Sequence, residues 1–152
     1  HALDDAEASR AAALGFDILV HAPTAALTDA TVTAWGGKVV ISTLDAFGGS
    51  PTAIDNLRRL REAGATVLYG TDFGNSRTAG IQPRELEALE AAGMDGSAIL
   101  AAGTTAPAGV FGFELAIAPG MPASLLVLAE DPRTTASTLA RPKEVWIRGV
   151  RR

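Results

Sequence analysis

The sequence contains no cysteine, and this absence excludes several kinds of protein and of site. The chain can have no disulfide framework, no thiolate metal ligand and no cysteine nucleophile. A protein without disulfides suits a reducing compartment, so we expect a cytoplasmic location. Any metal site in this chain must use histidine nitrogen or carboxylate oxygen as ligands.

Basic clusters and long apolar runs are also missing. The 13 Lys and Arg residues are scattered, and the net charge is −4 at pH 7. Nucleic acids and anionic membranes attract clustered positive charge, so we expect neither as a partner. The apolar runs fall well short of the ~18 residues that a membrane-spanning helix needs. These absences favour a protein that acts on a small molecule.

The first two thirds of the chain alternate short apolar runs with amphipathic stretches, which is typical of β–α units on a mainly parallel sheet. The pattern predicts strands over 16–20, 39–41 and 66–69. Helices are expected over 4–14, from 28 or 29 to 35, and from Pro51 until Gly64 ends the third. Strand starts are 23 and then 27 residues apart, which is close to the spacing in a βα barrel of ~250 residues.

The pattern changes after Asp72. A polar loop over 73–80 precedes expected helices at 83–92, 96–102 and 105–111. Short strands are then expected near 115–117, 125–128 and 145–147, with Arg148-Gly149 as a hairpin turn. The change in composition near residue 113 predicts two domains, residues 1–112 and a small β-domain over residues 113–152.

Three side chains combine suitable chemistry with suitable placement, namely His1, His21 and Asp72. His21 and Asp72 each follow an apolar strand, and active sites of parallel α/β barrels form at the carboxyl ends of strands. Imidazole and carboxylate are common ligands for zinc and similar divalent ions. Structural roles remain open as well, since a strand-end histidine is often a hydrogen-bonded core residue and an aspartate often caps a turn.

Several segments resemble the amidohydrolase superfamily, in particular its imidazolonepropionase-like and prolidase-like members. Residues 1–22 are similar to the strand-5 and strand-6 units, and 56–64 with Tyr69-Gly70-Thr71-Asp72 are similar to the strand-8 region. Residues 101–108 resemble the helix that follows. Residues 118–128, with Asp131-Pro132, resemble the closing β-domain segment. The resemblance runs through nearly the whole chain in family order.

This resemblance implies a fold and a function. The fold would be the C-terminal part of a TIM-like (β/α)8 barrel, comprising strands 6–8 and the end of strand 5, plus the closing strands of a small β-sandwich. His1 and His21 would match the strand-5 and strand-6 metal ligands, and Asp72 the strand-8 aspartate that contacts metal and shuttles protons. The cofactor would be a divalent metal, zinc above all, as one or two ions. The reaction would be hydrolysis of an amide or cyclic amide C–N bond by metal-activated water.

The chain departs from the family pattern in several places. The strand-1 His-x-His pair is absent, and neither Lys38 nor Lys143 stands where the strand-4 ligand would be. Ser124 and Ala106 replace the Asp and Asn that the family often has at two structural positions.

The chain starts at His1, and we expect it to be one piece of a longer polypeptide or to pair with a second chain that carries the N-terminal half of the barrel. Open strand edges also favour association, so we expect a homo-oligomer.

Other functions remain compatible with these residues. A deaminase of the same superfamily would use the same ligands, and so would a phosphotriesterase or lactonase. A non-catalytic scaffold or assembly protein would keep the fold without the upstream ligands.

Overall fold

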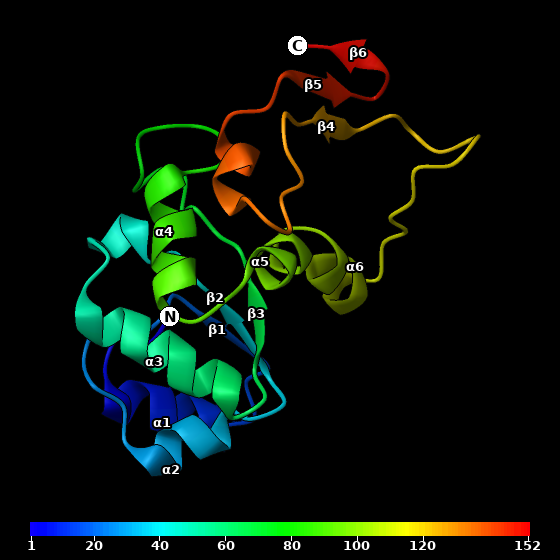
Figure 1. Ribbon diagram of the computed structural model, residues 1–152. Helices are drawn as coiled ribbons and strands as arrows, with labels where there is room; N and C mark the ends of the chain where they lie inside the picture. The colour runs from blue at the N-terminus through cyan, green and yellow to red at the C-terminus, as the bar shows by residue number, and fades with distance from the viewer.

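The computed structural model describes residues 1–152 and contains two separate sheets (Figure 1). A parallel sheet has the order β1-β2-β3, formed by Ile18–Val20, Val39–Ile41 and Thr66–Leu68. An antiparallel sheet has the order β4-β5-β6, formed by Leu125–Val127, Glu144–Ile147 and Val150–Arg151.

The chain also forms six α-helices and two short 3-10 helices. They are α1 (Asp5–Ala13), α2 (Asp29–Ala34), η1 (Asp45–Phe47), α3 (Pro51–Glu62), α4 (Pro83–Ala91), α5 (Gly96–Ala102), α6 (Thr105–Phe111) and η2 (Ala136–Ala140). Helices α1, α2 and α3 are stacked together beside the parallel sheet, whereas α5 and α6 lie next to β3 (Figure 1). None of the helices is long and apolar enough to cross a membrane.

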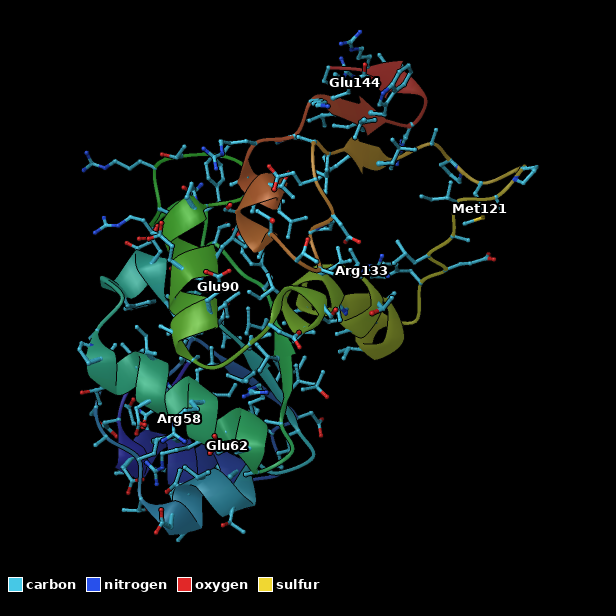
Figure 2. The ribbon with its side chains drawn as sticks, in the orientation of Figure 1. Arg58, Glu62, Glu90, Met121, Arg133 and Glu144 are labelled. Carbon is cyan, nitrogen blue, oxygen red and sulfur yellow. The ribbon has the colours of Figure 1, made fainter.

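Helix α3 shows how local sequence sets the element boundaries. The Ser50 side chain accepts a hydrogen bond from the Ala53 N–H at 3.2 Å, and Pro51 occupies the first turn, where no N–H is needed. Gly64 ends the helix with a φ of 95°. On the outer face of α3, Arg58 forms a salt bridge with Glu62 at 2.7 Å, and the two residues lie close together in Figure 2. The predicted range of this helix is confirmed.

The core lies between the parallel sheet and its helices. Leu19, Val40 and Val67 occupy the same register position on the three strands, and all three are buried. They belong to a cluster of 23 buried apolar residues that also contains Leu57 and Leu60 of α3. Each large side chain buried in this way contributes roughly 1.5–3 kcal/mol, so the cluster anchors the strands and fixes where their ends lie.

The expected fold class is wrong. The parallel strands form an open three-stranded sheet, and the antiparallel strands form one further three-stranded sheet, so the chain is a mixed α/β protein without a barrel fragment or a sandwich. The β–α rhythm correctly predicted local units with parallel strands. The same rhythm builds open sheets as well as closed barrels, because closure depends on strand number and tilt, which local periodicity does not encode.

Details of the C-terminal region also differ from the prediction. No strand forms at residues 115–117, which lie in the segment without regular structure that follows α6 and carries Met121 (Figure 2). The predicted turn at Arg148-Gly149 is confirmed between β5 and β6, with both residues at positive φ as a tight hairpin requires. Ala136 and Leu139 of η2 belong to the main core cluster, and the two-domain division remains a prediction.

Candidate functional site

Three non-glycine residues with left-handed backbone lie just past the ends of the three parallel strands. His21 follows β1 with a φ of 74°, Thr43 follows β2 with 51°, and Asp72 follows β3 with 49°. Each such residue costs roughly 1–2 kcal/mol relative to right-handed backbone. Strain of this kind persists where the surroundings impose it, and it concentrates at functional sites. The carboxyl edge of the parallel sheet is therefore the candidate functional site.

Two histidine rings meet at this edge. The Nε2 atom of His21 lies 2.8 Å from Nδ1 of His1, and the ring centroids are 4.5 Å apart in an edge-to-face arrangement. One of these two nitrogens must carry the shared proton, and the other must accept it. The sequence placed His1 and His21 twenty residues apart, and the fold brings their nitrogens into contact.

His21 is held from its other side by Thr43. The Oγ1 atom of Thr43 lies 2.8 Å from His21 Nδ1, and both residues are only 3% exposed. The Phe47 ring packs against the imidazole with a centroid distance of 4.7 Å. Contacts to both ring nitrogens and to one ring face therefore fix the orientation of His21, which is the role that outer partners have for metal-binding histidines.

Burial lowers the pKa of His21 below its ordinary value. The negative charge of Asp72 acts in the opposite direction and raises the pKa. Neutral imidazole is the form that binds metal ions, so this environment favours a ligand-competent histidine.

The charge of Asp72 acts on His21, but the ring nitrogens of His21 are hydrogen-bonded to Thr43 and His1 and not to Asp72. The carbonyl oxygen of Asp72 accepts hydrogen bonds from the N–H groups of Asn75 and Ser76, which closes a turn directly after the strand. Its carboxylate has no hydrogen-bond partner in the chain and is only partly exposed.

Gly70 permits the close approach of β2 and β3 beside the site. A Cβ atom at this position would lie 2.5 Å from Cγ2 of Ile41 and 2.9 Å from Cγ2 of Thr43. Real Cβ atoms do not tolerate such distances, so the packing around Thr43 depends on a missing side chain.

The three predicted site residues therefore gather at one edge, but they do not form a complete metal site. No group of three His, Asp or Glu residues is arranged to hold a metal ion. His1 and His21 present two converging nitrogens, which is half of the four-ligand set that zinc prefers. The histidine pair thus fits a divalent metal in part, and Asp72 is not close enough to complete the ligand set.

Thr43 and Phe47 were missed by the sequence interpretation. Thr43 lies two residues after the predicted strand over 39–41, whereas His21 follows its own strand directly. Its position near a strand end was the available signal, but a threonine hydroxyl gives a weaker indication of chemistry than an imidazole.

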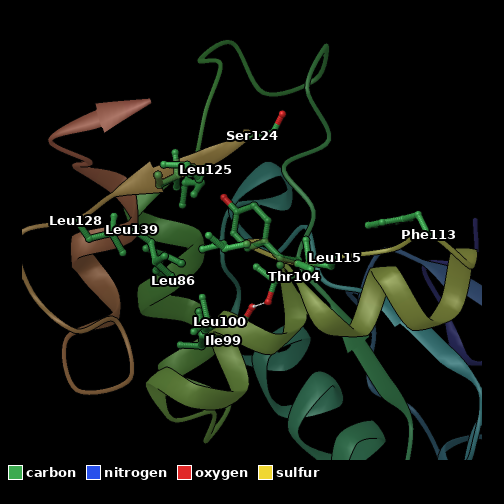
Figure 3. A pocket seen from close by; sticks show the side chains of 16 residues that line it. Leu86, Ile99, Leu100, Thr104, Phe113, Leu115, Ser124, Leu125, Leu128 and Leu139 are labelled. Atoms are coloured by element: carbon green, nitrogen blue, oxygen red, sulfur yellow. Dashed lines mark hydrogen bonds between the residues drawn. The ribbon is translucent and has the colours of Figure 1, made fainter. Parts of the chain in front are cut away.

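A large cavity lies elsewhere, between α4, α5 and the segment leading into β4 (Figure 3). Its volume is about 680 Å³, and 13 of its 16 lining residues are hydrophobic. The Thr104 hydroxyl at its wall donates to the Leu100 carbonyl at 2.6 Å and so is already engaged. None of His1, His21 and Asp72 lines this cavity, so it is separate from the candidate site.

Comparison with known proteins supports the fold alone. No protein-family model and no curated protein sequence matches the chain. A crystal structure of an uncharacterized protein is similar, with a TM-score of 0.70 and 21% sequence identity. The alignment covers 97% of this chain and 43% of that one, so the chain spans less than half of the structure it matches.

Proposed function

We propose that this chain contributes to a divalent-metal site of a hydrolase that cleaves C–N bonds, with His1 and His21 as ligands and Asp72 as the proton-transfer group. The proposal is supported by one observation above all, the 2.8 Å approach of His21 Nε2 to His1 Nδ1 at a strained sheet edge. These are the three residues that the resemblance to amidohydrolases implied, although the barrel implied by the same resemblance is not present.

The roles of the side chains follow from their surroundings. A bound divalent metal would supply Lewis acidity and lower the pKa of a bound water molecule. His21 would bind through Nε2, because Nδ1 is engaged by Thr43. The unpartnered Asp72 carboxylate would accept a proton from the attacking water and return it to the leaving nitrogen. The remaining ligands would come from solvent, substrate or a further protein segment.

Metal titration is the direct test. Co²⁺ added to the chain should bind with a saturating absorption change and with one ion per chain, and His21→Ala should abolish it. Binding that does not saturate, or that is unaffected by His21→Ala, would remove the histidine pair from any metal site.

Hydrolysis is tested on the zinc-loaded protein with cyclic amides and dipeptides. Asp72→Asn should remove most of the kcat and retain metal. Asp17→Asn is the matched control, because Asp17 is exposed and precedes β1 at the opposite end of the sheet, and it should change neither the kcat nor the metal content.

A structural role for the histidine pair is the second candidate, favoured by the hydrogen bonds that already satisfy both nitrogens of His21. In that case His21→Ala would lower the free energy of unfolding without any effect of metal.

A further inference from the structure

Glu85 is a buried carboxylate with no cationic partner. It lies in the first turn of α4, is only 1% exposed, and takes part in no salt bridge. Its Oε2 accepts a hydrogen bond from the Asp45 N–H at 2.6 Å, whereas Oε1 has no hydrogen-bond partner. Glutamate is almost never fully buried unless it is paired, so this position requires an explanation.

The surroundings of Glu85 consist of the segment that follows β2. Burial raises the pKa of the carboxyl, and the Ser42 hydroxyl and the N–H groups of Asp45 and Leu44 lower it by a smaller amount. These groups all belong to residues 42–45, which leave β2 and enter η1. The Glu85 carboxylate therefore holds this turn by accepting a hydrogen bond from the backbone N–H of Asp45.

The turn that Glu85 holds, residues 42–45, contains Thr43. Its left-handed backbone aims the hydroxyl at His21, with 2.8 Å between Thr43 Oγ1 and His21 Nδ1. His21 in turn approaches His1. A connected series of contacts thus runs from α4, through the backbone of residues 43–45, to the histidine pair.

We infer that Glu85 is a positioning residue for the candidate site: it holds the 42–45 turn so that Thr43 orients the His21 ring. This inference rests on the proposed function for its catalytic meaning, although the orientation itself is measurable without metal. An apolar side chain would fill the same space, but it would leave the Asp45 N–H unpaired and the turn free to relax. Glu85 acts through the turn and is not expected to touch substrate.

The experiment compares three substitutions in the full chain. Glu85→Leu removes the acceptor at similar volume, and Glu85→Gln keeps one amide oxygen as acceptor. Glu87→Leu is the matched control, because Glu87 lies on the exposed face of the same helix. The first readout is the ¹⁵N spectrum of the His21 ring in metal-free protein, which reports the tautomer. The second is amide hydrogen exchange at Asp45, and the third is Zn²⁺ affinity.

Glu85→Leu should speed amide hydrogen exchange at Asp45 about tenfold or more. The ¹⁵N spectrum of the His21 ring should change from that of one tautomer to the average of both tautomers. Zn²⁺ affinity should fall about 10-fold or more, as for other outer partners of metal-binding histidines. Glu85→Gln and Glu87→Leu should both remain close to wild type. Thr43→Val should reproduce the change in the His21 spectrum while leaving Asp45 exchange slow. This variant removes the hydrogen bond between Thr43 and His21 but keeps the one between Asp45 and Glu85.

A His21 spectrum that is unchanged in Glu85→Leu would overturn the inference. So would a Glu85→Gln variant that behaves like Glu85→Leu, because hydrogen bonding would then not be the cause. If Glu85→Leu does not fold, fast Asp45 exchange in the wild-type protein would be equally decisive against it. A wild-type chain that binds no Zn²⁺ would refute the proposed function alone, since the tautomer and exchange readouts test Glu85 without metal.

Discussion

Gly70→Ala is expected to destabilise the protein and to disturb the candidate site at the same time. The new Cβ would lie 2.5 Å from Cγ2 of Ile41 and 2.9 Å from Cγ2 of Thr43. Both neighbours are β-branched, so their methyl groups cannot move without a change of χ1 or of backbone. Gly70 does not have positive φ, so the effect of the substitution is one of space and not of backbone conformation.

The magnitude follows from the cost of adding a methyl group to a packed interior, which is about 1–3 kcal/mol. For a chain of this size, each kcal/mol corresponds to roughly 2–4 °C in Tm. Gly70→Ala should therefore lower the Tm by about 2–12 °C. Because Thr43 is one of the two displaced neighbours, its hydrogen bond to His21 should weaken as well.

Thermal unfolding and urea unfolding, both followed by circular dichroism, measure the change in Tm and in the free energy of unfolding, and the His21 ring ¹⁵N spectrum measures the effect on the site. Gly109→Ala is the matched control, because Gly109 is an exposed position within α6 whose added Cβ would meet nothing within 4 Å. That substitution should raise the free energy of unfolding by about 0.5–1 kcal/mol. A Gly70→Ala protein as stable as wild type, with an unaltered His21 spectrum, would refute the packing argument.

Three further predictions concern the same edge of the sheet. Because burial lowers the pKa of His21, the unfolded chain takes up a proton first as the pH falls below ~6.5. The free energy of unfolding should therefore decline from pH 7 to pH 5 more steeply in wild type than in His21→Gln, as measured by urea titration. Asp72→Asn removes a negative charge that raises the pKa of His21, so an NMR titration should show that pKa lowered further, and an unchanged value would mean that Asp72 lies too far away. Asn56→Ala should cost at least about 2 kcal/mol in urea unfolding, since it strips partners from the Leu27 N–H and from the Pro23 and Ala25 carbonyls, whereas exposed Asn75→Ala should be neutral.

Local features of the fold were predictable from the sequence because they depend on neighbouring residues. The helix that starts after Ser50 and ends before Gly64 is determined by a cap, a first-turn proline and a stop signal. The three parallel strands were predicted from short apolar runs. The arrangement of the sheets was not predictable in this way, because nothing in the local pattern tells an open sheet from part of a closed one.

The candidate site shows the same division. His21 and Asp72 were predicted as site residues because each follows an apolar strand and the carboxyl ends of parallel strands meet at one edge, a rule that needs no coordinates. Glu85 was not found, although Leu86 and Leu89 place it beside the buried stripe of α4. Its role depends on a contact with Asp45, forty residues away, and a tertiary contact of that kind leaves no periodic trace in the sequence.

The left-handed backbone of His21, Thr43 and Asp72 has a consequence for protein engineering. Glycine would relieve the conformational cost at each of these positions, and at the partly exposed Asp72 it would forfeit little packing. Laboratory selection for heat resistance alone should therefore accept glycine at Asp72, and the resulting proteins would survive heating while losing the carboxylate. If the proposed function holds, screening such a library for stability and for the proposed metal-dependent turnover in parallel would show opposite preferences at this one residue.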